Sequence, residues 1–227
     1  MPVLHFKRAR SKPCSLQDGW FGWWLRILPG GQNKVMRQLP ILSPSAALIL
    51  VDIQIGFDDP KWGSRNNSDA EVNAGMLLQA WRSSGRPLFH IQHASRLENS
   101  PLNPARDGFR FKSIVQPESG ETVLIKSVNS GFIGTNLETE LRSRGVSQVV
   151  VVGLTTPHCI STTTRMAGNL GFETYLVSDA TAAFALTGPD GVCHDAETIH
   201  RISLATLHEE FAEVVTTEMI LESLNLH

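Results

Sequence analysis

Residues 148–165 read QVVVVGLTTPHCISTTTR, and this stretch decides the fold. The four consecutive valines, Val149 to Val152, predict a strand that is buried on both faces, as strands of parallel sheets are. Gly153 ends that strand, and a short turn follows it. Pro157 suits the beginning of a helix, which we expect to start at or near Cys159. A thiol therefore stands where a buried strand passes into a helix.

The position of Cys159 has two interpretations. Unpaired N–H groups and the helix dipole favour an anion at a helix N-terminus, so this position would stabilise a thiolate. The alternative is an ordinary core residue, because free cysteines are among the most buried residues in proteins. The stretch alone does not decide between a nucleophile and a core residue, and the decision depends on the rest of the chain.

The composition indicates one sizeable α/β domain. The chain has 227 residues, of which 41% are apolar, and a net charge of -2, which suits one such core better than two. No apolar run approaches the roughly 18 residues that a membrane span needs, so we expect no membrane partner. Cys14, Cys159 and Cys193 are far apart and form no CxxC pair. This pattern predicts neither a disulfide framework nor a zinc site, and it favours a reducing, cytoplasmic setting.

Residues 1–40 differ from the rest of the chain. They hold seven basic residues, one acidic residue and three of the five tryptophans. We interpret them as a basic, Trp-rich extension without regular structure, ahead of a domain spanning 41–227. An organelle transit peptide and a membrane-surface or partner-binding arm are the alternatives. The domain itself is acidic, with thirteen basic and twenty-one acidic residues, which argues against a nucleic-acid partner.

Apolar runs and turn residues alternate along the domain. Strands are predicted at 46–51, 87–91, 122–125, 149–152, 173–178 and 211–215, and helices at 68–84, 135–144, 159–170, 194–208 and 217–224. Ser68 and Thr135 begin sequences typical of capping boxes, and Val72, Met76 and Trp81 form the apolar stripe of the first helix. The order of the elements predicts a single three-layer α/β/α domain with a largely parallel, Rossmann-like, six-stranded sheet.

Three residues with complementary chemistry follow predicted strands at their carboxyl ends: Asp52, Lys126 and Cys159. Doubly wound sheets bind ligands at this edge. A thiol with a pKa of about 8.5 is only about 3% ionised at neutral pH, and a nearby ammonium would raise that fraction. A carboxylate can take the thiol proton, pass it to a leaving amine and then activate water. Backbone N–H groups of the turn can stabilise an oxyanion.

Four stretches together resemble the isochorismatase-like cysteine hydrolases, which include nicotinamidase and N-carbamoylsarcosine amidase. The stretches are ALILVDIQIGF (47–57), IKSVNSGFIGTNLETELRSRGV (125–146), VVVGLTTPHCISTTTRMAGNLGFETYLVSDATAAF (150–184) and the helix-plus-FAEVV tail, in which FAEVV is 211–215. The resemblance spans roughly 43–224. It implies a hydrolase that cleaves a C–N bond, amide or carbamoyl, of a small-molecule substrate through a thioester, and it implies a homo-oligomer.

The resemblance also assigns roles to residues. Asp52 corresponds to the general base, Lys126 to the activating lysine and Cys159 to the nucleophile. A non-proline cis bond would fall at Leu154–Thr155, and the N–H groups of Thr155 and Cys159 would form the oxyanion hole.

Three departures from the family pattern argue against some of the activities found in the family. Pro157 stands where the family often has Asp, and Cys159 argues against cleavage of isochorismate itself. There is no Asp-x-His metal motif, and His90 and His93 are expected on opposite sides of a strand. We therefore predict no metal and no cofactor, and the pattern argues against nicotinamide as the substrate.

Substrate specificity is expected in the loops 54–67 and 94–120, which are long for a compact domain. The candidate substrate-binding residues are Phe57, Trp62, His93, Phe132 and His158. For each of them, ordinary packing is the alternative.

Two other functions are compatible with parts of the sequence. His158, Cys159 and Arg165 match the HC-x5-R signature of phosphatases, whose loop grips a phosphate with its arginine. That loop needs glycine to bring N–H groups to the anion, and 160–164 contains none. The second alternative is a non-catalytic interaction module on the same fold, which would not need Asp52 and Lys126.

Overall fold

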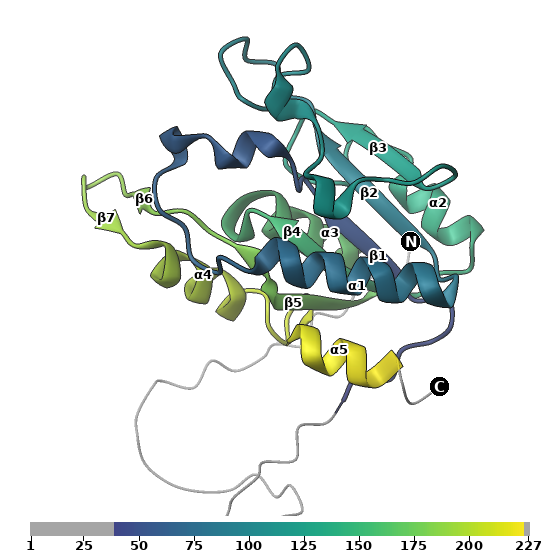
Figure 1. Cartoon of the computed structure of the whole chain (residues 1–227). Helices are drawn as coiled ribbons and strands as arrows, with labels where there is room; N and C mark the ends of the chain where they lie inside the picture. Colours follow the sequence, from purple (N-terminus) through teal and green to yellow (C-terminus); the bar gives the residue numbers. More distant parts are fainter. Residues whose placement is uncertain (1–38, 225–227) are drawn as a thin grey trace, which may run out of the picture. The chain divides into compact units, whose positions relative to one another are not determined.

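The computed structural model describes residues 39–224, which form an α/β domain of three layers (Figure 1). Its central sheet has six strands in the order β3-β2-β1-β4-β5-β8, and every neighbouring pair is parallel. The strands are β1 (Ala47–Val51), β2 (Leu88–His93), β3 (Thr122–Lys126), β4 (Gln148–Leu154), β5 (Glu173–Ala182) and β8 (Glu213–Val215). The predicted fold class is confirmed.

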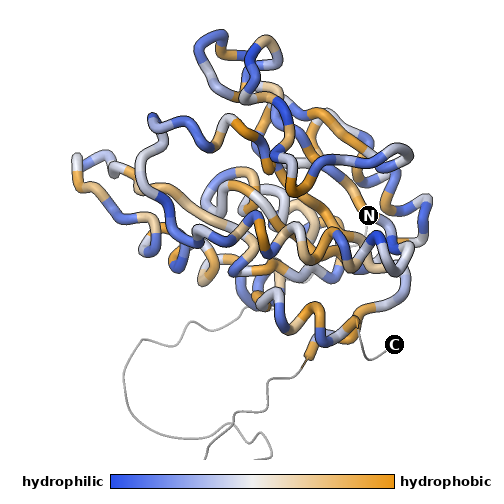
Figure 2. Tube along the Cα trace, viewed as in Figure 1, coloured by the Kyte–Doolittle hydropathy of each residue, from blue (hydrophilic) through white to orange (hydrophobic). Residues whose placement is uncertain are grey.

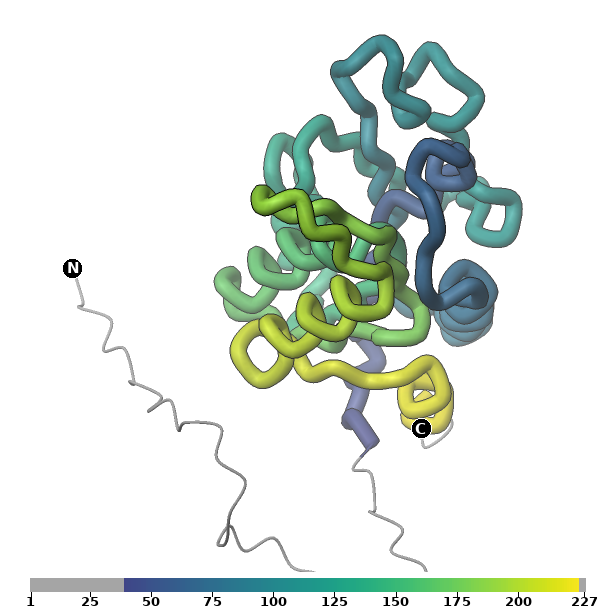
Figure 3. Tube along the Cα trace, turned by 90° about the vertical axis from the view of Figure 1, so that its left-hand side faces the viewer, coloured from purple at the N-terminus to yellow at the C-terminus, as the bar shows by residue number. Residues whose placement is uncertain are grey.

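Helices cover both faces of this sheet (Figure 3). They are α1 (Ala70–Ser84), α2 (Leu137–Ser143), α3 (Ser161–Asn169), α4 (Ala196–Ala205) and α5 (Thr217–Leu224). α1 and α5 share one apolar core with the sheet, and α2 and α3 share the other. Among the described residues, no helix is both long and apolar enough to cross a membrane.

The two cores explain why the central strands are continuous apolar runs. Every residue of β1 and β4 is buried. Alternate residues point to opposite faces of a strand, so Leu48 and Leu50 enter the core under α1, and Ala47 and Ile49 enter the core under α2 and α3. Figure 2 shows these strands as hydrophobic, whereas the outer loops carry more hydrophilic segments.

Gly153 was predicted to end the fourth strand, but β4 continues through it to Leu154. Its φ is 123°, and a Cβ atom built at this position would lie 2.0 Å from the carbonyl oxygen of Val51. Only glycine allows the two backbones to approach this closely. The end of β1 and the turn after β4 are thereby brought together.

Two expectations about helix ends were wrong. α1 begins at Ala70 with Asp69 at its N-cap, and α2 begins at Leu137 with Asn136 at its N-cap, and neither N-cap makes a side-chain hydrogen bond. The Thr135 hydroxyl instead donates to the carbonyl of Gly131 over 2.6 Å. The same hydroxyl accepts a hydrogen bond from the N–H of Leu137 over 3.3 Å, so Thr135 contacts the first turn from one residue ahead of the N-cap.

The apolar stripe of α1 was predicted one position away from its true place. Val72 and Met76 are 49% and 44% exposed, whereas Trp81 is buried as expected. The buried face instead includes Leu77 and Leu78. Trp81 fixes this orientation, since its Nε1 donates to the carbonyl of Ala46 over 3.0 Å.

The chain between 173 and 195 contains more strand than predicted. β5 runs past Asp179 to Ala182, and the Asp179 side chain accepts hydrogen bonds from the N–H and hydroxyl of Thr217 at the start of α5. A small antiparallel pair, β6 (Leu186–Thr187) and β7 (Cys193–His194), follows. Two-residue strands are too short to show a period in sequence.

Short turns complete the domain. The loop 54–67 contains two 3-10 turns, η1 (Ile55–Asp58) and η2 (Pro60–Trp62), and the loop 94–120 contains η3 (Asp107–Phe109) and η4 (Ser113–Val115). A single π-helical turn, η5 (Thr156–Ile160), joins β4 to α3. The predicted extension 1–40, together with Cys14, lies outside the described residues except for its last two positions.

Candidate active site

Asp52, Lys126 and Cys159 meet at the carboxyl edge of the sheet. Asp52 directly follows β1, Lys126 is the last residue of β3, and Cys159 lies in η5 after β4. The Lys126 Nζ atom is 2.5 Å from Asp52 Oδ2 and 3.4 Å from Cys159 Sγ. All three side chains are buried. The sequence had placed them on one rim, and the structure places them in direct contact.

The backbone at Asp52 is unusual. Its φ is 53°, in the left-handed region, which Asp tolerates better than most residues. The Asp52 N–H donates to the carbonyl of Ile91 over 2.9 Å, and the Asp52 carbonyl accepts from the N–H of Gln54. These contacts turn the side chain inward. Its Oδ1 atom is buried and has no hydrogen-bond partner among residues 39–224.

Burial has the largest effect on the pKa values of Cys159 and Asp52. Burial raises the pKa of the Cys159 thiol well above its usual range, and the Asp52 carboxylate adds to this effect, while Lys126 opposes it. Burial also raises the pKa of Asp52 against the influence of Lys126. The expectation of a stabilised thiolate was therefore wrong for the free protein. Cys159 rests as a thiol, and a base must remove its proton during any attack.

The turn that carries Cys159 is tightly folded. The Leu154–Thr155 peptide bond is cis. The Thr155 carbonyl accepts hydrogen bonds from the N–H groups of His158 and Ile160, over 3.0 and 3.2 Å. Thr155 and Cys159 both line the cavity described below.

His93 is a fourth member of the cluster. It is the last residue of β2, and it lies beside Lys126 in the register of β2 and β3. Its Nδ1 atom is 3.0 Å from Lys126 Nζ. Burial and the charge of Lys126 lower the pKa of His93 to about 4, so the ring is neutral at neutral pH and accepts the ammonium hydrogen bond at Nδ1.

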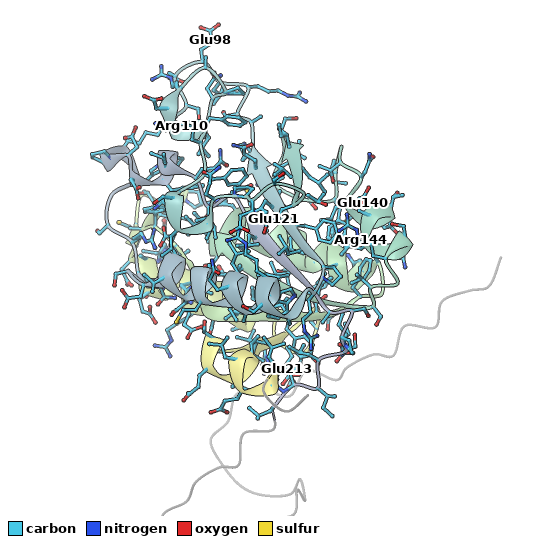
Figure 4. The ribbon with its side chains drawn as sticks, turned by 45° about the vertical axis from the view of Figure 1, so that its right-hand side comes forward. Glu98, Arg110, Glu121, Glu140, Arg144 and Glu213 are labelled. Carbon is cyan, nitrogen blue, oxygen red and sulfur yellow. The ribbon has the colours of Figure 1, made fainter. Side chains whose placement is uncertain are left out.

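His90 lies on the opposite face of β2, as predicted. Its Nε2 atom is 2.9 Å from Glu121 Oε2, and Glu121 also binds Arg82. Figure 4 labels Glu121, which lies away from the loop tip that carries Glu98 and Arg110. His90 therefore belongs to a structural network and not to the cluster around Cys159.

The cluster suits an ammonium better than a metal ion. Asp52, His93 and Cys159 offer ligand atoms that lie within 4.8 Å of one another. Lys126 Nζ is within hydrogen-bonding distance of all three side chains. A metal ion bound by these atoms would have to displace that positive charge from a buried position. The donor set is already matched to a cation that belongs to the chain.

A cavity of about 440 Å³ opens above Cys159. Four of the predicted substrate-binding residues line it: Phe57, Trp62, His93 and His158. The other lining residues are Lys61, Leu102, Asn129, Thr155, Pro157, Phe184, Ala185 and Leu186. Loops 54–67 and 94–120 both contribute, as expected.

Three aromatic rings form one wall of the cavity. The ring centroids of Phe57, Trp62 and Phe184 are 5.5, 5.9 and 6.3 Å apart in pairs. The Trp62 Nε1 atom donates to the carbonyl of Gly56 over 2.8 Å, which orients its ring. Sequence reasoning missed Phe184, although it ends the third stretch quoted above. The longer course of β5 brings it to the site.

Phe132 was assigned to the pocket wrongly. It is 8% exposed and stacks on Phe172 at 6.1 Å, in the core beneath α2 and α3. Asn129 lines the cavity instead, with its Oδ1 atom 4.0 Å from Cys159 Sγ. Its position three residues after Lys126 was the available signal.

The structure contradicts the phosphatase alternative. The Arg165 guanidinium lies over the ring of Phe211 at 4.6 Å and donates to the hydroxyl of Thr206. Arg165 does not line the cavity above Cys159. The segment that would have to wrap a phosphate is partly the helix α3.

Comparison with known proteins identifies the family. The model of the isochorismatase domain matches residues 46–219. The chain belongs to the isochorismatase family. It is 54% identical over 175 residues to the isochorismatase-family protein YrdC of Bacillus subtilis, an alignment that covers 77% of this chain and 94% of YrdC.

Two further relatives of this isochorismatase-family chain bear on its structure and chemistry. A solved isochorismatase-family structure from Chromobacterium violaceum has a TM-score of 0.82 and 42% identity, covering 85% of this chain and all of that one. Nicotinamidase 3 of Arabidopsis thaliana is 27% identical over 198 residues, which is 80% of this chain and 90% of that protein. The chain is an enzyme of the isochorismatase-family hydrolases.

Proposed function

We propose that this hydrolase cleaves the C–N bond of a small amide or carbamoyl compound through a thioester on Cys159. The observation that carries the proposal is the buried cluster in which Lys126 Nζ contacts both Asp52 and Cys159. Buried charges are costly unless they are paired, and this pair lies beside a thiol at the floor of a cavity. Nicotinamidase, an amidase by name, supports the choice of bond.

The first half of the reaction forms the thioester. Asp52 takes the Cys159 proton as Sγ attacks the substrate carbonyl, and the N–H groups of Thr155 and Cys159 stabilise the resulting oxyanion. Lys126 stays charged and offsets the negative charge that moves from carboxylate to sulfur. Protonated Asp52 then gives its proton to the departing nitrogen, the C–N bond breaks, and ammonia or an amine leaves.

The second half releases the acid. Asp52, again a carboxylate, removes a proton from a water molecule that attacks the thioester carbonyl. The C–S bond breaks, and the proton on Asp52 returns to sulfur. The cycle consumes one water molecule and restores the thiol and the carboxylate.

The cavity narrows the substrate class. Its wall of Phe57, Trp62 and Phe184 presents ring faces, and Leu102 and Leu186 add apolar surface. A flat, apolar acyl group would bury its surface there, at about 25 cal/mol per Å². Asn129 and His158 provide hydrogen-bonding groups near Cys159.

Intact-protein mass spectrometry during turnover tests this proposal. The enzyme is incubated with a panel of small amides, ureas and carbamoyl compounds, and ammonia is measured in parallel. We expect a transient acyl adduct on the peptide containing Cys159. Cys159→Ala should abolish both the adduct and turnover without loss of fold, and Cys193→Ala, at an exposed cysteine, should change neither. Full activity in Cys159→Ala would refute the mechanism.

A further inference from the structure

His200 connects the turn of the nucleophile to two other parts of the domain. It lies on α4, and its side chain is buried. Its Nδ1 atom is 2.8 Å from the hydroxyl of Thr156, the first residue of η5. Its Nε2 atom is 3.3 Å from Asn67 Nδ2. Nothing in the mechanism above uses this side chain.

The contacts of Asn67 determine the orientation of its side-chain amide beside His200. Asn67 Nδ2 also lies 3.0 Å from the carbonyl of Ser178 and 2.7 Å from that of Thr181. The atom of the Asn67 amide that faces these two carbonyls must therefore be the NH2 nitrogen, because an amide oxygen there would repel both carbonyl oxygens. The two hydrogens of this NH2 group face three acceptors, the carbonyls of Ser178 and Thr181 and His200 Nε2, and the Ser178 carbonyl also accepts a hydrogen bond from His200. The hydrogen bond between His200 Nδ1 and Thr156 forms in either tautomer, since a hydroxyl can donate or accept. Burial also lowers the pKa of His200, which keeps the ring neutral.

Thr156 lies between the two residues whose N–H groups are assigned to the oxyanion hole. It follows Thr155, whose N–H is assigned to the oxyanion hole, and it precedes Cys159 by three residues. Its side chain is completely buried. The bond from His200 therefore ties the backbone of the oxyanion hole to α4, and the bond to Asn67 ties it to loop 54–67 and β5.

We propose that His200 is a positioning residue that holds the oxyanion-hole turn through the hydrogen bond between its Nδ1 atom and the Thr156 hydroxyl. The inference rests on the proposed function, since it assigns His200 an effect on oxyanion stabilisation. His200 does not line the cavity above Cys159. Loss of one oxyanion donor lowers kcat by about 10²–10³, and a donor that is present but misplaced should cost less.

Two conservative variants separate the two bonds of His200. In His200→Asn, the shorter amide can place its oxygen or its NH2 group near the position of Nδ1 and keep the bond to Thr156, whose hydroxyl can donate or accept. In His200→Gln, the longer amide reaches the position of Nε2 and keeps the contact with Asn67. Each variant loses one bond of similar kind, so a purely structural role predicts similar effects on thermal unfolding and on activity.

The test measures p-nitrophenyl acetate hydrolysis, iodoacetamide alkylation of Cys159 and Tm for each variant. We expect kcat to fall about tenfold in His200→Gln and to stay within about twofold in His200→Asn. KM and the alkylation rate should stay within about twofold in both, because the surroundings of Sγ are unchanged. Thr156→Val should match His200→Gln, Thr156→Ser should retain activity, and the double variant should lose no more than either single one.

Equal kcat values in His200→Asn and His200→Gln would overturn the inference, as would losses that follow Tm or that appear in KM. Such results with an active unsubstituted enzyme leave the proposed function intact. Absence of turnover by the unsubstituted enzyme, on this ester and on the amide panel, would instead contradict the proposed function and the inference with it.

Discussion

Lys126 is the residue on which the protonation of its neighbours depends. It supplies the positive charge next to a buried carboxylate, a buried thiol and a neutral imidazole. Lys126 is the main group that offsets the cost of burying Asp52 as an anion, and a hydrogen bond from Cys159 adds a smaller effect. The activity and the stability of the site are therefore linked through one side chain.

Lys126→Met removes the charge and keeps most of the side-chain volume. Asp52 then loses the main group that lowers its pKa, so this pKa rises further and less of the base is ionised. We expect kcat/KM at pH 7 to fall by about a hundredfold or more, with partial recovery as the pH rises. Alkylation of Cys159 should also slow. Lys61→Met, at an exposed lysine of the same cavity, is the control, and equal effects in both variants would contradict this role.

Gly153 illustrates how one missing side chain permits the site. A Cβ atom there would meet the Val51 carbonyl, one residue before Asp52. Gly153→Ala should destabilise the fold by about 3 kcal/mol or more, since backbone must move. Gly85→Ala is the control, because Gly85 also has a positive φ of 63° but has no atoms within 4 Å of an added Cβ. Its cost should be about 1–2 kcal/mol. Urea unfolding measures both, and similar losses would refute the argument.

At the scale of elements, one partly buried ion cluster holds loops 54–67 and 94–120 against α1. Glu71, on α1, binds Arg65 of the first loop and Lys112 of the second, with Lys112 Nζ 2.7 Å from Glu71 Oε1. Lys112 also contacts Asp58, one residue after Phe57 of the aromatic wall. The cluster therefore positions part of the cavity without touching it.

Glu71 should make stability depend on pH. Burial alone would raise its pKa, but hydrogen bonds from Arg65 and Lys112 lower it to about 2, from 4.5. A lowered acid pKa gives stability that is complete above pH 4.5 and is lost as the pH falls through about 2. We expect Glu71→Gln to be less stable at pH 7 by at most about 3 kcal/mol, with the difference shrinking toward pH 2. Urea unfolding at several pH values measures this.

The matched control for this series is Glu98→Gln. Glu98 lies at the exposed tip of the second loop (Figure 4) and has no resolved ion pair in the described chain. It should show the same pH dependence as the unsubstituted protein. A constant difference for Glu71→Gln across this pH range would show that Glu71 contributes packing and not charge.

The elements also show what the sequence could reveal about the site. Val149 to Val152 and the run before Asp52 are buried on both faces, so their ends, and with them Asp52, Lys126 and Cys159, could be placed on one rim. Periodicity shows that a residue is buried but not whether it faces a core or a cavity. Phe132 and Phe184 are both aromatic and buried, and only the course of β5 decides that Phe184 belongs to the cavity.

The protonation state of Cys159 could not be predicted from the sequence, because it depends on how deeply the packed domain buries the thiol. The neighbours of the thiol were predicted correctly as types, an ammonium and a carboxylate. The sign of the shift depends on how completely water is excluded, and that is a property of the packed domain. Homo-oligomer formation also stays a prediction, which sedimentation at several protein concentrations would test.

At the scale of the whole domain, the cavity wall is assembled from parts far apart in the chain. Phe57 and Trp62 come from the first loop, and Phe184 follows β5. Asn66 joins these parts, since its Oδ1 accepts from the Ala183 N–H and its N–H donates to the Ala183 carbonyl. Substrate recognition therefore depends on the tertiary structure as much as on any single residue.

Phe184→Ala should weaken recognition while leaving the chemistry intact. The variant removes one ring face that contacts an apolar acyl group but none of the groups around Sγ, so KM for an aromatic amide should rise about tenfold, or about 1.4 kcal/mol, with kcat nearly unchanged. Acetamide, which is too small to reach the wall, should be affected less. Phe132→Leu is the control, because Phe132 stacks on Phe172 in the core, and it should lower Tm without changing KM. A loss of kcat in Phe184→Ala, equal for both amides, would mean that the ring orders the nucleophile and does not bind the substrate.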